Sequence, residues 1–117
     1  MKAYHAEIDN VKLISVNAKY CKAGILSSKY RKCKQDLTTA FAFFITDGML
    51  SGPLSMKIDL TCYGRADYDN FLKVIGDSLQ LAGVIEDDYM IEECHIRKRP
   101  QKRGRMEKLI IDIREVE

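Results

Sequence analysis

The sequence lacks tryptophan, has only two prolines and contains no long apolar run. Its longest purely apolar segment, residues 40–45, is far shorter than the roughly 18 residues that a membrane-spanning helix needs. The first residues also lack the continuous apolar region of a secretory signal peptide. We therefore expect no membrane partner and a cytoplasmic location.

Closely spaced cysteine ligands are absent as well. The four cysteines, Cys21, Cys33, Cys62 and Cys94, lie 12, 29 and 32 residues apart, so none shows the short C-x-x-C or C-x-x-H spacing of zinc sites. Cys33, Cys62 and Cys94 each fall within a helix or strand pattern, where a free buried cysteine is common. We expect all four to be reduced and no zinc site.

What is present fits one compact domain. The chain has 117 residues, 46% of them hydrophobic and 31% charged, a composition typical of neither disordered nor membrane proteins. A chain of this length buries about two-thirds of its unfolded surface, enough for a single core. We expect one domain over residues 1–117.

Charge is strongly segregated, although the net charge is only +2. Residues 67–93, the acidic region, carry a net charge of −7, whereas the other 90 residues carry +9. Two basic blocks stand out, together with the separate Arg65: the first block is Lys29, Arg31, Lys32 and Lys34, and the second is Arg97, Lys98, Arg99, Lys102, Arg103 and Arg105. The pattern favours a cation held by carboxylates and a polyanion on the basic surface. The alternative is that each run is simply a solvated face.

Hydrophobic periodicity predicts two helices and four strands. The first helix begins at Ser27 or Ser28, ends near residues 47–48 and has an apolar stripe of Tyr30, Cys33, Leu37, Phe41 and Phe44. The second helix spans about residues 68–82, ends at Gly83 and has a stripe of Phe71 or Leu72, Ile75, Leu79 and Ala82.

The predicted strands span residues 3–9, 54–62, 89–98 and 105–116. Strict alternation predicts that the second strand buries Leu54, Met56, Ile58, Leu60 and Cys62, and the last strand buries Leu109, Ile111 and Ile113. We expect residues 100–104 to form a hairpin turn between the last two strands. The order β-α-β-α-β-β predicts an α+β domain with helices on one face of a mixed sheet.

Carboxylates gather around the second predicted helix. Asp67 and Asp69 lie where the preceding strand leads into it, and Lys73 follows Asp69 by four residues, on the same helical face. If the link after the helix folds back, Asp87 or Asp88 joins them. Three neighbouring carboxylates repel one another, and a hard divalent cation such as Mg²⁺ or Mn²⁺ relieves that repulsion.

Such a site supports phosphodiester hydrolysis, because a bound metal activates water and neutralises charge on the phosphate. Each residue also has a plainer interpretation. Asp67 or Asp69 can cap the helix, Lys73 can form a surface pair, and Asp87 with Asp88 can form an ordinary acidic turn.

The motif G-R-A-D-Y-D-N at residues 64–70, followed by Lys73, Asp77, the Ala-Gly pair at 82–83 and Asp87-Asp88, resembles the RusA family of Holliday-junction resolvases. The resemblance covers about residues 54–114. It implies that the catalytic, metal-binding carboxylates are Asp67, Asp69 and Asp88, and that Lys73 is the essential lysine. It also implies that Asp87 only precedes the third carboxylate.

The resemblance further implies a Mg²⁺-dependent homodimer, often encoded by phages and prophages, that nicks opposing strands of four-way DNA junctions. One site per chain agrees with this, since a two-fold dimer can cut two symmetry-related strands. We expect the two basic blocks and Arg65 to contact DNA, and no small-molecule cofactor. The alternatives are a non-catalytic branched-DNA-binding accessory protein and a purely structural dimerisation domain.

Overall fold

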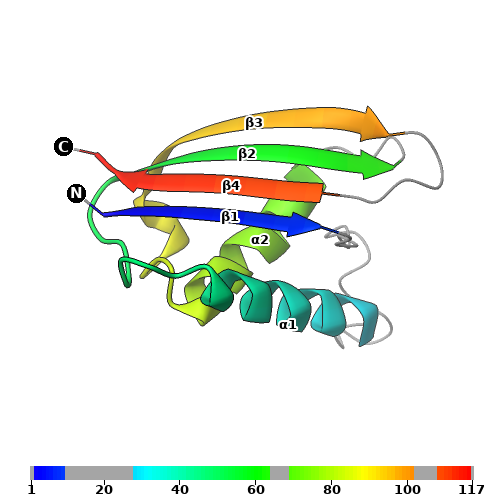
Figure 1. Ribbon diagram of the computed structural model, residues 1–117, viewed down its shortest axis with the longest axis horizontal. Coiled ribbons are helices and arrows are strands. Elements are labelled where there is room, and N and C mark those ends of the chain that lie inside the picture. Colours follow the sequence, from blue (N-terminus) through cyan, green and yellow to red (C-terminus); the bar gives the residue numbers. More distant parts are fainter. Residues whose placement is uncertain (1, 10–27, 64–68, 102–107, 117) are drawn as a thin grey trace.

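The computed structural model describes residues 2–9, 28–63, 69–101 and 108–116. Its elements follow the predicted order, with one additional short 3₁₀ turn before the third strand (Figure 1). They are β1 (Ala3–Asp9), α1 (Ser28–Phe43), β2 (Leu54–Tyr63), α2 (Asp69–Ala82), η2 (Asp88–Met90), β3 (Ile91–Gln101) and β4 (Lys108–Glu115). The predicted α+β class is confirmed, in one compact domain.

The four strands form one mixed sheet in the order β1-β4-β2-β3, with both helices on the same face (Figure 1). β2 pairs with β3 in parallel, and β4 pairs antiparallel with both β1 and β2. β2 and β3 can be parallel because α2 connects them. The helix carries the chain back to the end of the sheet where β2 began, so β3 runs in the same direction as β2.

The predicted hairpin between the last two strands is wrong, because β2 lies between β3 and β4. Pro100 belongs to β3, opposite Cys62 of β2, and residues 102–107 lie outside the described residues. The apolar content of the strands explains the order. β4 buries three large aliphatic side chains and takes a central place, whereas the charged, proline-containing β3 suits an edge.

The core lies between the sheet and the helices, as the periodicity predicted. The fully or nearly fully buried residues include Tyr4 and Ala6 of β1, Leu54, Met56, Ile58 and Leu60 of β2, Leu109, Ile111 and Ile113 of β4, Tyr30, Cys33, Leu37 and Phe41 of α1, and Ile75 and Leu79 of α2. Phe44 and Leu72 are only partly buried. Ser55 is an exception: the alternation in β2 predicts that its side chain lies on the solvent-facing side of the sheet, but it is only 4% exposed.

The two helices end differently. α2 ends at Ala82, and the predicted terminator Gly83 follows it with a φ of 81°, a conformation that favours glycine. α1 ends at Phe43, four residues earlier than Asp47. The amides of Phe44 and Ile45 bond the carbonyls three residues before them, at 3.2 and 3.3 Å, which tightens the last turn and stops the helix.

Cys33 and Cys94 are reduced, in agreement with the prediction for those two. Cys33 is buried, but Cys94 is exposed, contrary to expectation, because it sits on the edge strand β3. Cys21 and the side chain of Cys62 lie outside the described residues. Within the described part of the chain, neither helix has the length and apolar character needed to cross a bilayer.

Candidate functional site

The candidate site is built around α2, which begins at Asp69 after the end of β2. Asp67 lies outside the described residues, as does the side chain of Asp69. The position of Asp69 is nevertheless defined by the helix. Asp69, Lys73 and Gly76 follow one another at intervals of four and three residues, which places these positions on one face of α2.

Lys73 is half exposed on this face and pairs with Asp77, one turn further along. Its Nζ lies 3.3 Å from the Asp77 Oδ1, and the Asp77 side chain is 18% exposed. A surface pair of this kind contributes about 0.5 kcal/mol or less. The pair is therefore weak enough to break, and the Lys73 ammonium group can instead bind an anion that approaches α2.

Asp87 and Asp88 are adjacent in sequence but have different surroundings. The Asp87 Oδ1 accepts a hydrogen bond of 3.3 Å from the backbone N–H of Tyr89, so Asp87 is the N-cap of η2. Asp88 is exposed, and its side chain lies against Gly76 in the middle of α2. The link after α2 thus folds back, and Asp88 is the aspartate that it brings to the helix.

Asp88 contacts α2 one turn beyond Lys73 and two turns beyond Asp69. Two turns correspond to about 10 Å along a helix axis. Among the described residues no group of three histidine, cysteine or acidic side chains is close enough to hold a metal ion. The donor chemistry fits a hard divalent cation, since every candidate ligand is a carboxylate and Asp88 makes no hydrogen bond or ion pair with a described side chain.

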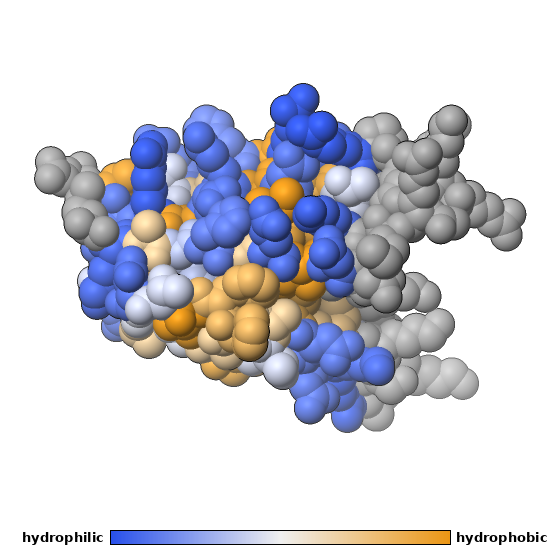
Figure 2. Space-filling model, in the orientation of Figure 1, coloured by the Kyte–Doolittle hydropathy of each residue, from blue (hydrophilic) through white to orange (hydrophobic). Residues whose placement is uncertain are grey.

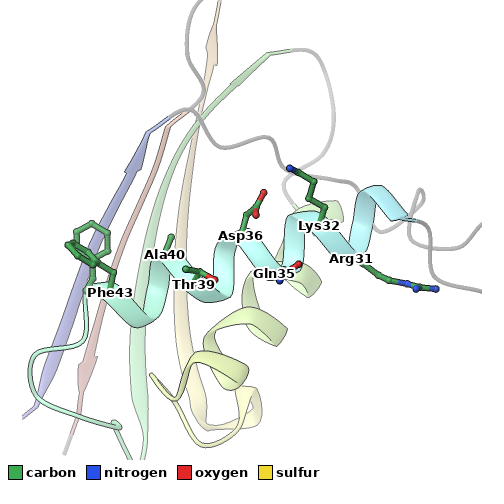
Figure 3. A pocket seen from close by; sticks show the side chains of 8 residues that line it. Arg31, Lys32, Gln35, Asp36, Thr39, Ala40 and Phe43 are labelled. Atoms are coloured by element: carbon green, nitrogen blue, oxygen red, sulfur yellow. The ribbon is translucent and has the colours of Figure 1, made fainter.

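The first basic block lies on the opening turns of α1. Arg31 and Lys32 are exposed and project from the helix (Figure 3). Lys34 is half-buried. The carbonyl of Lys34 accepts hydrogen bonds from Thr38 Oγ1 at 2.7 Å and from Ser78 Oγ of α2 at 3.4 Å. The side chain of Lys29 lies outside the described residues.

Of the second basic block, the structure describes the part on β3. Arg97 and Arg99 are exposed on the sheet face that the helices leave open, and Lys98 is half-buried on the other face. The Arg99 Nε lies 3.2 and 3.4 Å from the two carboxylate oxygens of Asp59. The remaining predicted DNA contacts lie outside the described residues: Arg65, Lys102, Arg103 and Arg105.

The first basic block and the carboxyl-terminal half of β3, which bears Arg97, Lys98 and Arg99, lie toward the same end of the molecule. Figure 1 places the first turn of α1 and the carboxyl ends of β2 and β3 at the same end. α2 starts from the end of β2, so the Asp69 position lies there too. Figure 2 shows an apolar patch toward the other end of α1, the end at which Phe43 lies with 83% of its surface exposed.

One contact of Asp88 was missed from the sequence. Gly76 lies inside a helical pattern, where a glycine gives no sign of what packs against it. Only the folding back of residues 83–88 reveals that its neighbour is Asp88.

Comparison with protein families identifies the family of the chain. The model of a family described as endodeoxyribonuclease RusA matches residues 14–113, which span α1, α2 and most of the sheet. A comparison with curated proteins finds no match. Because the family match covers most of the chain, the protein belongs to the RusA family of endodeoxyribonucleases, which are Holliday-junction resolvases.

Proposed function

We propose that this protein uses Mg²⁺ or Mn²⁺ to cut four-way DNA junctions by paired nicks in opposing strands, acting as a homodimer in the cytoplasm. The observation that carries the proposal is the position of Asp88. The Asp88 side chain lies against α2, which is the helix that begins at Asp69 and bears Lys73. This arrangement agrees with the roles that the resemblance to the RusA family implies for Asp69, Lys73 and Asp88.

Asp67, Asp69 and Asp88 would hold the cation, which when bound supplies an activated water and neutralises charge on the scissile phosphate. Lys73 presents an ammonium group on the same face of α2. A fixed positive charge there stabilises the negative charge that develops on the phosphate. Asp87 has a different task, because its carboxylate is engaged in capping η2.

Arg31, Lys32 and Arg97 are exposed and are the best-placed described residues for contact with DNA phosphates. Phosphate contacts of this kind position a nucleic acid without reading its sequence. Arg31 and Lys32 lie on α1 toward the end of the molecule where α2 begins and would lead a DNA strand toward Asp69. Arg97 would hold DNA on the open face of the sheet. Recognition would thus depend on the shape of the junction.

Two symmetric nicks require two sites, and one chain carries one candidate site. A second copy related by a two-fold axis supplies the other. The proposal therefore predicts a dimer in solution, which sedimentation equilibrium measures directly.

The decisive experiment is cleavage of an end-labelled four-way junction beside a linear duplex of matched sequence, with Mg²⁺ and with EDTA. We expect paired nicks in the junction alone, and none in EDTA. Asp69→Asn and Asp88→Asn should lower the rate by about 100-fold or more while junction binding is retained or tightened. The matched control is Asp87→Asn, whose amide oxygen can still cap η2 and which should cut normally.

Metal-independent cutting, or parental cutting by Asp69→Asn or Asp88→Asn, would contradict the proposal. Junction binding without cleavage in either Mg²⁺ or Mn²⁺ would favour a non-catalytic branched-DNA-binding protein instead.

A further inference from the structure

Gly76 is buried at the boundary between the core side and the outward side of α2, one turn after the partly buried Leu72 and one turn before the buried Leu79. Lys73, one turn earlier on the same face, is exposed, while the core side of the helix is formed by Val74, Ile75 and Leu79. A position at this boundary is fully buried where a neighbouring segment also lies over it, and the segment that follows α2 does so.

The covering group is Asp88. A methyl group placed on the Gly76 Cα would lie 3.6 Å from the Asp88 Oδ2 and 3.7 Å from the Asp88 Cβ. Apart from the adjoining residues Ile75 and Asp77 and the local helix backbone, no other described atom lies within 4 Å of that methyl position. The space that a side chain at residue 76 would fill is thus bounded by the Asp88 side chain.

The backbone does not explain a glycine at this position. The glycines of the described residues with positive φ are Gly48, Gly52 and Gly83, so Gly76 has a conformation open to any residue. Glycine in a helix interior costs about 1 kcal/mol relative to alanine. A residue this small leaves room beside α2 for the Asp88 side chain, and a side chain larger than a methyl group would not.

We propose that Gly76 is a positioning residue that lets the Asp88 carboxylate lie against α2, one turn from Lys73. The inference rests on the proposed function, in which Asp88 holds the cation. A side chain longer than a methyl group at residue 76 would occupy the space of Asp88 and lift it away from the helix. The carboxylate would then be misplaced while the fold remains.

Three variants test this: Gly76→Leu, Gly76→Ala and the matched control Gln80→Leu, which adds the same apolar group one turn further along the same face. Three measurements separate positioning from folding. They are the melting temperature, junction affinity in EDTA, and Mn²⁺ binding without DNA, followed by the loss of the electron paramagnetic resonance signal of the free ion. Single-turnover cleavage completes the set.

We expect Gly76→Leu to cut about 100-fold more slowly, since a misplacement of about 1 Å can have that effect. It should bind Mn²⁺ as weakly as Asp88→Asn does, with unchanged junction affinity in EDTA. Gly76→Ala should cut normally, because 3.6 Å is an ordinary van der Waals distance, and Gln80→Leu should resemble the parent. If Gly76→Leu does not fold, Gly76→Gln provides a helix-favouring replacement with the same expected loss.

A folded Gly76→Leu or Gly76→Gln with parental cleavage and Mn²⁺ binding would overturn the positioning role if Asp88→Asn is inactive, and would leave the proposed function intact. Parental cleavage by Asp88→Asn would overturn the proposed function, and the role of Gly76 with it.

Discussion

His5 of β1 lies directly opposite Asp112 of β4 on the open face of the sheet, and its imidazole is held between two carboxylates. The His5 Nδ1 hydrogen-bonds the Asp112 Oδ1, and the His5 Nε2 lies 3.4 Å from the Glu7 Oε1. The hydrogen bond with Asp112 is the main reason that the pKa of His5 is raised above its ordinary value of 6.5, with Glu7 adding to the effect. The pair joins β1, an edge strand, to the central strand β4.

This pair predicts stability that depends on pH. Because the pKa of His5 is higher in the folded than in the unfolded protein, the folded state binds its proton more tightly. The stabilisation is fully present below the unfolded pKa and is lost as the pH rises through the folded pKa. Melting temperatures measured between about pH 5 and pH 8 should therefore fall at the upper end of that range.

The matched control for this prediction is His5→Gln, which keeps a polar side chain but cannot be protonated. The difference in melting temperature between parent and His5→Gln should shrink as the pH rises. A difference that is constant over the range would show that the pair contributes no pH-dependent stability. Cleavage should be unchanged at a pH where both proteins are folded, because His5 belongs to neither α2 nor the acidic region.

The neighbours Asp87 and Asp88 should respond in opposite ways to substitution. Asp87→Ala removes the cap on the Tyr89 amide and should cost about 1 kcal/mol of stability, whereas Asp87→Asn keeps an acceptor oxygen and should cost less. Asp88→Asn should leave stability unchanged, because Asp88 is exposed and makes no hydrogen bond or ion pair with a described side chain.

Urea denaturation of the three variants measures these changes in stability. In cleavage assays on the same samples we expect the opposite order, with Asp88→Asn the most impaired variant. An Asp88→Asn variant that is less stable than Asp87→Ala would mean that the two roles are exchanged.

The elements themselves could be predicted from the sequence because each depends on local patterns. Leu54 to Leu60 alternate with polar residues, and the stripes of α1 and α2 recur at helical spacing, so strands and helices follow from burial on one face. The sheet order could not be predicted in this way. β3 and β4 are adjacent in the chain but not in the sheet. β4 takes the central position because it buries three aliphatic residues.

The candidate site likewise has features that depend on local sequence and features that depend on packing between distant segments. The spacing from Asp69 to Lys73 is a local property of one helix and could be predicted. The choice between Asp87 and Asp88 depends on how a loop packs on α2, and the room at Gly76 depends on the same contact. Neither has a local pattern. The exposure of Cys94 was missed for a related reason, since an edge position is a property of the sheet.

Tyr4 connects the sheet to the end of α1, and its loss should be measurable in stability. Its buried hydroxyl donates a hydrogen bond of 2.8 Å to the carbonyl of Phe41, and burial raises the pKa of Tyr4 well above its usual value. Tyr4→Phe removes the donor and leaves a buried carbonyl without it, which should cost about 1–2 kcal/mol. Urea denaturation measures this. A cost near zero would mean that the Phe41 carbonyl finds another donor.

Arg97 and Arg99 lie two residues apart on the same face of β3, but only Arg99 is paired with a carboxylate, Asp59. The guanidinium of Arg97 makes no ion pair with a described residue. Arg97→Ala should therefore weaken junction binding more than Arg99→Ala does. It should also lower the slope of log affinity against log salt concentration by about 1, the value for one phosphate contact.

Asp59→Ala frees Arg99 from its partner and should tighten junction binding, because a positive charge becomes available and a negative charge is removed. The matched control for Arg97→Ala is Arg114→Ala. Arg114 lies toward the opposite end of the same sheet face, in register with Ala3 and Ser55. Fluorescence anisotropy with a labelled junction in EDTA, over a series of salt concentrations, measures all four variants. If Arg114→Ala weakens binding as much as Arg97→Ala, DNA lies over the whole open face, and the confinement of DNA to the basic end of the molecule is wrong.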